Sequence, residues 1–273
     1  MKQFFTLCLI LSVFFVKAQS TAVVKLKSSP TLGNYLVDKA DKTLYYFSND
    51  ANGKNNCSGG CEAAWPIFSG EVPTQAQLGQ GLSASDFATI TTAGGKKQVT
   101  YMGWPLYYFS PKNVPEPPNT TSGEGAGNVW YVAKPDYTVM IVNNQLTGND
   151  GKKYKSDYTE GEAKTAYLTD GKGRALYAFK NDKANKNNFT KEGAASKAWI
   201  IYEADQIVVP SKLDKSLFGT TDVFGKKQLT YNGWPLYYFG SDEGVAGSNK
   251  GVSVPQPGVW PIAAKDIAAA PAQ

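Results

Sequence analysis

The chain has 273 residues, with 28 basic and 23 acidic side chains and no histidine. The charges are scattered and form no basic block, so nucleic acid is not an expected partner. The lack of histidine excludes Ser-His-Asp and Cys-His catalytic arrangements, the common histidine zinc sites and histidine-ligated haem. Aromatic residues make up 13% of the chain beside 27 glycines, a composition that suits a β-rich protein with many turns.

The first residues have the pattern of a targeting segment. Lys2 provides a positive start, residues 4–16 form an apolar run, and a small-residue cleavage site ends at Ala18, before Gln19. The run is too short to span a membrane, so residues 1–18 are predicted to be a secretory signal peptide. Because no other apolar run approaches the length of a span, we expect an exported protein, periplasmic or extracellular, with no transmembrane segment.

Two stretches, residues 95–109 and 225–239, are nearly the same segment written twice, differing only at Val99/Leu229 and Met102/Asn232. In both, a two-residue turn ending in glycine separates two apolar runs, which is a strong β-hairpin signal. A repeat of this length indicates duplication and predicts two homologous halves.

The other features recur in the same order in both halves. The expected order is a hairpin, a polar loop, a tryptophan segment, the duplicated hairpin and a closing strand. In the first half these are residues 33–50, 49–56, 57–66, 95–109 and 129–132. In the second half they are residues 166–179, 181–188, 197–199, 225–239 and 259–262. We therefore predict a mostly β fold in two homologous halves, 32–142 and 163–267, joined by a polar linker, 143–162. Each half is expected to hold two hairpin-centred sub-repeats with short helical turns.

A shorter motif, Tyr-x-Phe-x-x-Asp, marks the sub-repeats. Its complete copies are Tyr45, Phe47 and Asp50, then Tyr177, Phe179 and Asp182, then Tyr237, Phe239 and Asp242. A fourth copy has Tyr107 and Phe109 but carries Lys112 where the acid is expected.

With this motif, two further blocks resemble a family of bacterial secreted and lipoprotein repeats named for a Tyr-x-aromatic-x-x-Asp motif. The blocks are Gln98-Val99-Thr100-Tyr101-x-Gly103-x-Pro105-Leu106-Tyr107 and Cys57…Cys61…Trp65-Pro66. The resemblance covers roughly 32–135 and 165–264, and it implies export but no activity, because the function of the family is unassigned. The chain departs from the lipoprotein members in lacking a lipidation cysteine, since Cys8 lies inside the apolar run, and from the motif at Lys112.

Cys57 and Cys61 are the only cysteines after the signal peptide. An isolated pair in an exported protein predicts a structural disulfide, and a redox-active pair is the alternative. Haem attachment is excluded, because there is neither a Cys-x-x-Cys spacing nor a histidine.

The motif aspartates have two interpretations. Each follows a strand at the mouth of a polar loop, where a carboxylate can accept backbone N–H bonds and fix the turn. The alternative is a calcium site, since Asp50 lies near Asn52, Asn55 and Asn56, which offer oxygen ligands. No stretch matches an EF-hand loop, so we expect no metal.

The aromatic side chains also allow two interpretations, a buried core or an exposed platform for a glycan or flat ligand. Tyrosine-ligated haem would need no histidine but has no supporting motif, so we expect no cofactor. No nucleophile and base pair or phosphate-binding loop stands out. We therefore expect no enzyme but a binding or envelope-interaction module, whose partner is a small molecule, a glycan or an envelope protein. The alternative is a small secreted hydrolase that uses acidic residues.

Overall fold

The computed structural model describes residues 23–193 and 196–273, so the predicted signal peptide, 1–18, lies outside the described residues. Within them the chain is mostly β, with one short α-helix and several one-turn 3-10 helices. The strands are β1 (Val24–Ser29), β2 (Gly33–Asp38), β3 (Tyr45–Phe47), β4 (Phe87–Thr91), β5 (Lys97–Tyr101), β6 (Trp104–Pro105), β7 (Trp130–Val132), β8 (Val139–Thr147), β9 (Lys153–Tyr154), β10 (Lys164–Asp170), β11 (Trp199–Ile201), β12 (Phe218–Val223), β13 (Lys226–Tyr231), β14 (Trp234–Pro235) and β15 (Tyr237–Phe239). The α-helix is α1 (Gly60–Ala64), and the 3-10 turns are Ser48–Asp50, Gln75–Gln77, Ala84–Asp86, Pro111–Asn113, Ala126–Asn128, Lys215–Leu217, Gly240–Asp242 and Lys250–Ser253.

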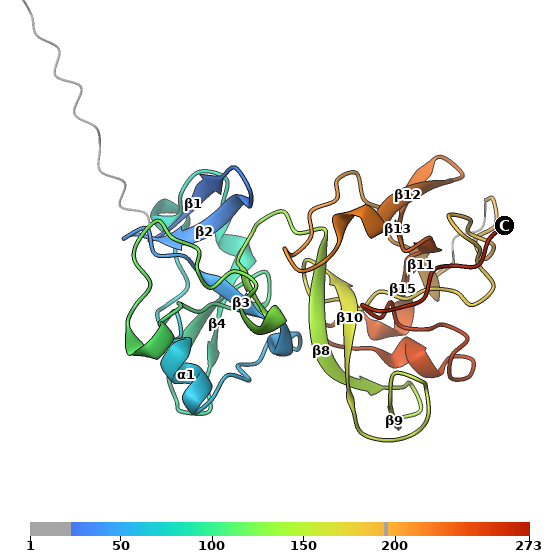
Figure 1. Cartoon of the computed structure of the whole chain (residues 1–273), viewed down its shortest axis with the longest axis horizontal. Helices are drawn as coiled ribbons and strands as arrows, with labels where there is room; N and C mark the ends of the chain where they lie inside the picture. Colours follow the sequence, from blue (N-terminus) through green and yellow to red (C-terminus); the bar gives the residue numbers. More distant parts are fainter. Residues whose placement is uncertain (1–22, 194–195) are drawn as a thin grey trace, which may run out of the picture.

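The strands form small antiparallel sheets, and the same sheets recur in two lobes (Figure 1). The pair β1 and β2 of the first lobe corresponds to β8 and β10 of the second. The three-stranded sheet β4-β5-β6 corresponds to β12-β13-β14. The prediction of a mostly β fold in repeated halves is therefore confirmed.

The duplicated segment forms the predicted hairpin in both halves. The turn residues, Met102-Gly103 and Asn232-Gly233, all have positive φ, from 47° to 89°, as a type I′ turn requires. Strand β5 pairs with β6, and β13 pairs with β14. Pro105 and Pro235 lie in the edge strands of these sheets, where the missing N–H breaks no ladder bond.

The second apolar run of each predicted hairpin, 104–109 and 234–239, does not form one continuous strand. Strand β6 ends after two residues, and Tyr107 then exchanges backbone hydrogen bonds of 2.9 and 3.1 Å with Tyr45. Tyr237 and Tyr177 do the same at 2.9 Å each. The two sub-repeats of each half are thus joined through the backbones of their motif tyrosines. The segment 259–262, predicted as the closing strand of the second half, is not a strand in the structure. It contributes a single β-bridge, between Ile262 and Tyr177.

Strand β8 crosses the predicted end of the first half at residue 142. It pairs with β10 over residues 139–145 and with β9 at its end. Leu146 and Tyr154 are buried, so much of the predicted linker, 143–162, is folded onto the second half. The physical reason is that β8 and β10 form the starting pair of that half, as β1 and β2 do in the first.

The halves pack against each other through close backbone contacts. Trp104 donates its indole N–H to the carbonyl of Gly171, at 3.0 Å. A side chain at Gly171 would collide with the carbonyl oxygen of Tyr137. Gly173 has a φ of +81°, and a Cβ there would lie 3.1 Å from the carbonyl oxygen of Ala51. Only glycine satisfies both the close approach and the positive φ in this turn.

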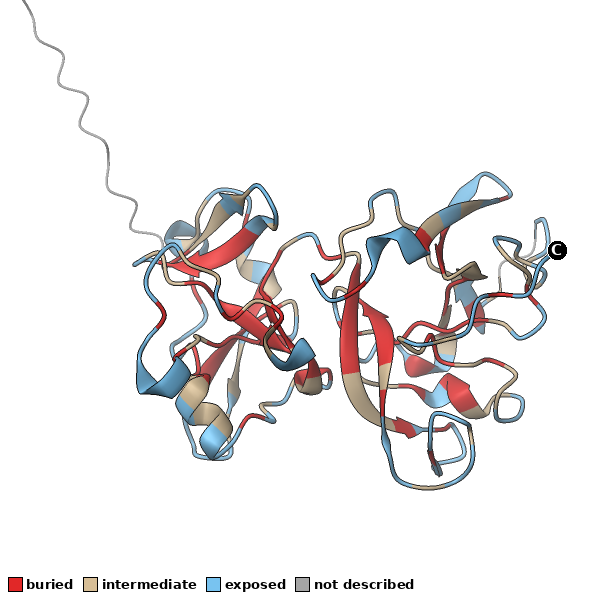
Figure 2. Ribbon diagram, viewed as in Figure 1, coloured by how far each residue is buried: buried red, intermediate tan, exposed pale blue. Residues whose placement is uncertain are grey.

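One buried hydrophobic cluster extends across both halves. It includes Tyr46 and Trp104 from the first half and Met140 and Leu168 from the second. Most of β8 and β10 is buried (Figure 2). The halves therefore share a core.

Candidate functional site

An aromatic stack lies beside the motif in each half. In the first half, the ring centroids of neighbours are 4.1, 3.8 and 4.4 Å apart along the order Phe47, Trp130, Trp65, Phe109. In the second half, they are 4.4, 3.7 and 4.5 Å apart along the order Phe179, Trp260, Trp199, Phe239. The four tryptophans are exposed by 6% or less, which favours a core over an exposed stacking platform. Phe109 and Phe179 are only half-buried.

The hydroxyls of the motif tyrosines cross between sub-repeats. In the second half, Tyr177 donates to Asp242 at 2.6 Å, and Tyr237 donates to Asp182 at 2.7 Å. In the first half, Tyr107 donates to Asp50 at 2.5 Å. Each tyrosine therefore binds the acid of the other sub-repeat, and not the acid of its own motif.

The second oxygen of each motif acid accepts from the loop that follows it. Asp50 accepts the backbone N–H of Asn56 at 2.8 Å, and Asp182 accepts that of Asn188 at 2.7 Å. Asp242 accepts the N–H of Lys250 at 2.9 Å. These contacts favour the loop-fixing interpretation over a cation site, because protein donors engage both carboxylate oxygens.

The motif copy that carries Lys112 recruits a different acid. Glu116 accepts the hydroxyl of Tyr45 at 2.7 Å and also the backbone N–H of Ser122. It is buried, whereas Lys112 is exposed and has a φ of 54°. Glu116 thus replaces the missing motif aspartate in both of its contacts. The sequence contains one indication of this role. Glu116 follows the motif closely and precedes Gly123, the loop glycine that lies against the ring of Tyr45.

Burial controls the charge of two of these acids. It raises the pKa of Asp50 to about 7, against the opposing effect of the bonds from Tyr107 and Asn56. It raises the pKa of Asp182 to about 6 in the same way. Burial and the neighbouring Asp50 hold the pKa of Tyr107 far above its ordinary value, so its hydroxyl stays a donor.

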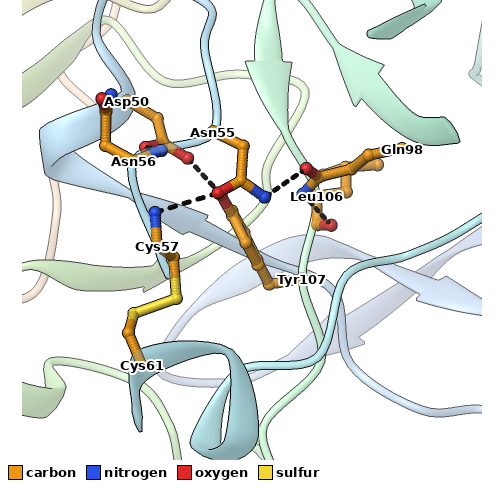
Figure 3. Close-up of a disulfide and its surroundings, with 8 residues drawn as sticks. All are labelled: Asp50, Asn55, Asn56, Cys57, Cys61, Gln98, Leu106 and Tyr107. Atoms are coloured by element: carbon orange, nitrogen blue, oxygen red, sulfur yellow. Dashed lines mark hydrogen bonds between the residues drawn. A yellow bond between two sulfur atoms is a disulfide. The ribbon is translucent and has the colours of Figure 1, made fainter. Parts of the chain in front are cut away.

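A side-chain amide pair fastens the same loop to the duplicated hairpin (Figure 3). Asn55 donates to Gln98 at 2.7 Å and accepts the N–H of Cys57 at 2.9 Å. Gln98 in turn donates to the carbonyl of Leu106 at 3.0 Å. The same bonds occur in the second half through Asn187 and Gln228.

The predicted disulfide is present. Cys57 is bonded to Cys61, and the two residues bracket the start of α1, beside the loop that Asp50 anchors (Figure 3). Cys57 is buried and packs in the cluster that contains the first aromatic stack. The position suits a structural bond that closes the loop onto the stack.

A small pocket occurs at the same motif position in both halves. The first, of about 210 Å³, is lined among others by Tyr108, Phe109 and Glu116. The second, of about 150 Å³, is lined by the corresponding Tyr238, Phe239 and Asp242. In each, the last ring of the aromatic stack and a buried carboxylate meet at one cavity.

The two pockets differ in the cation at their rim. In the second, Arg174 lies over the ring of Tyr238, 4.5 Å from its centroid, and bonds to Asp170 at 2.5 Å. In the first, the corresponding residue is Lys42, which makes no ion pair within residues 23–193 and 196–273. The first pocket therefore offers the free ammonium group of Lys42. In the second pocket, Asp170 neutralises the charge of Arg174.

The described part of the chain contains no candidate metal site and no candidate membrane span. No group of three or more Cys, Asp or Glu side chains there could hold a metal ion. No helix formed by those residues is long and apolar enough to cross a bilayer.

Comparison with known proteins matches three segments of the chain, 28–69, 88–134 and 220–264, to a family described as a secreted repeat of unknown function. The segments hold three of the four sub-repeats. The fourth, around Tyr177, is identified by the structure, because its tyrosine and Asp182 make the same contacts. No curated protein matches the chain, and no solved structure does.

Proposed function

This chain belongs, through three of its repeats, to a family of secreted repeats of unknown function, and on that premise we propose that it is an exported, non-catalytic binding module. Its setting is the periplasm or the extracellular space. The observation that supports binding is the recurrence of one pocket at the same motif position in both halves.

The size of the pockets limits what they hold. At about 210 and 150 Å³, both are smaller than the roughly 300–1,000 Å³ typical of sites for drug-sized ligands. Each fits one ring or one side chain. A small molecule, or the end group of a larger glycan or envelope protein, is the partner that this volume suits.

The first pocket is the better candidate of the two. Its lining is mostly apolar, with Pro66, Phe109 and Pro115 on its walls and Lys42 at its rim. A ring that carries an acceptor or an anionic group would pack on these walls and bind the ammonium.

Catalysis by the motif acids has no support in the geometry. Asp50, Glu116, Asp182 and Asp242 each use both oxygens in bonds to a tyrosine hydroxyl and to the following loop. A hydrolytic carboxylate must instead reach a substrate or a water.

Native mass spectrometry of protein purified gently from the exported fraction tests the proposal. We expect a bound mass on the wild type that is lost in Pro115→Trp, which fills the pocket, and reduced in Lys42→Gln. Lys39→Gln is the matched control, because Lys39 is exposed on the same turn and does not line the pocket. A bound mass that survives in Pro115→Trp would contradict binding at this pocket.

A further inference from the structure

The two halves differ beside the tryptophan that follows the polar loop. In the first half, α1 and its disulfide occupy this place. Glu62 of α1 pairs with Lys96 at the tip of the β4-β5 hairpin, at 2.9 Å. This ion pair links the helix to the hairpin tip.

The described part of the second half has no helix at this place. Phe189 takes the place of Cys57, since its N–H bonds to Asn187 at 2.9 Å as that of Cys57 bonds to Asn55. Residues 190–193 and 196–198, as far as the structure describes this loop, form no helix. Lys226, the counterpart of Lys96, pairs with Glu203 instead, at 2.8 Å.

This difference leaves a cavity of about 340 Å³ on the second half, and its lining is largely apolar. Trp199, Ile200 and Val223 form walls, and Phe224 stands at the hairpin tip. Ile200 and Phe224 are exposed by 45% and 55%. The cavity is larger than either motif pocket, and it shares Ile200 with the second of them but no residue with the first.

Phe224 occupies a backbone position that disfavours it. Its φ is 53°, in the two-residue turn that joins β12 to β13. Asn, Asp or Gly fills such a turn at lower cost, and a bulky residue there is an outlier. The first half has no equivalent of this tight turn, because five residues, 92–96, join β4 to β5 there. Because Phe224 is mostly exposed, packing within the chain does not account for the strain, and strain of this kind gathers at binding sites.

The two charged residues that line the cavity are both lysines. Lys191 and Lys226 are both exposed and line it. Glu203 already neutralises Lys226, while Lys191 makes no ion pair in the described part of the chain. We infer that this cavity is a second binding site, which takes a small aromatic anion, with the ring between Phe224 and Trp199 and the anionic group at Lys191.

Fluorescence titration of the full chain with anilinonaphthalene sulfonate tests the site. We expect saturable binding of one probe per chain, about tenfold weaker in Phe224→Asn. Asn suits the turn, so this variant keeps the hairpin. Lys191→Gln should weaken binding by about threefold at low salt. Phenylnaphthylamine, which has the same rings but no charge, should bind more weakly than the sulfonate.

Val114→Ala is the matched control, because Val114 is exposed by 65% on the first half and should leave the titration unchanged. Lys42→Gln should also leave it unchanged, because the motif pocket of about 210 Å³ fits a single ring and the probe has three, so the two sites are tested independently. Equal affinity for the charged and uncharged probes, or unaltered binding in Phe224→Asn, would overturn the inference.

Discussion

Tyr45 and Tyr107 exchange two backbone hydrogen bonds, and each donates its hydroxyl to the acid that anchors a loop in the other sub-repeat. Neither sub-repeat can therefore satisfy its buried carboxylate alone. Tyr177 and Tyr237 repeat the arrangement. The pair of sub-repeats is consequently the smallest unit in which these carboxylates are satisfied.

Tyr107→Phe should lower the free energy of unfolding by about 1–3 kcal/mol, because it leaves a carboxylate oxygen of Asp50 buried without its donor. Tyr237→Phe should have a similar effect through Asp182. Tyr131→Phe is the control, since that hydroxyl binds only the neutral carbonyl of Asn128. Urea unfolding measures all three, and a loss for Tyr107→Phe no larger than for the control would contradict the crossed arrangement.

Glu116→Ala should also cost about 1–3 kcal/mol, because the hydroxyl of Tyr45 and the N–H of Ser122 both lose their acceptor. Lys112→Ala should stay within about 0.5 kcal/mol of the wild type, since Lys112 is an exposed surface residue. Urea midpoints for the two variants give the comparison. If Lys112→Ala were the more damaging change, Glu116 would not be the substitute for the motif acid.

The duplicated hairpins, their turn residues and the disulfide follow from local sequence patterns. An Asn-Gly pair favours the positive φ values that the turn requires, and two isolated cysteines can form only one disulfide. The hydrogen bonds of the tyrosine hydroxyls to the acids of the other sub-repeat could not be predicted. A motif shows which residues occur together along the chain, but not which copies of the motif are in contact in the fold. The pairing of Tyr107 with Asp50 spans 57 residues.

The continuation of β8 past residue 142 is likewise not visible in the local sequence pattern. The segment after Val142 is polar in composition, yet β8 continues through it because β10 supplies the missing partner. Glu116 was not predicted either, since it stands outside the motif spacing. In each case a contact distant in sequence overrides the local pattern.

The disulfide should stabilise the full chain by about 2 kcal/mol, as expected for closing so short a loop. Urea unfolding with and without reductant measures this contribution. Cys57→Ala/Cys61→Ala should match the reduced wild type and should not respond to reductant. Two free thiols in the exported protein would contradict the structural bond.

Gly173→Ala should destabilise the contact between the halves. The substitution pays the positive-φ cost and also brings a methyl group against Ala51 and Ala246, at 3.1 and 3.2 Å. Gly151→Ala is the matched control, because Gly151 has a similar φ, +77°, but meets no atom within 4 Å. The difference in unfolding free energy between the variants isolates the contact, and equal losses would show that backbone strain alone is measured.

Asp50 should make the protein less stable as pH rises. Its pKa in the folded chain is about 7, raised by burial from an ordinary value of 3.8. Between these values the folded state holds a proton that the unfolded state has released, so the free energy of unfolding falls with increasing pH. This contribution is fully present below pH 4, is lost as the pH rises through about 7, and amounts to at most about 4 kcal/mol. Asp182 adds a smaller fall that ends near its own pKa of about 6.

Asp50→Asn should flatten this dependence. Asparagine cannot ionise, and it keeps one acceptor oxygen of the two that Tyr107 and Asn56 use. Its stability should therefore be lower than the wild type at pH 4.5, by about 1 kcal/mol for the lost bond, and the difference should shrink or reverse near pH 8. Asp222→Asn, at the exposed hairpin tip, is the control and should keep the wild-type slope. Urea unfolding at several pH values measures the slopes, and a wild-type stability that rises steadily from pH 4 to pH 8 would show that Asp50 is ionised in the folded chain throughout.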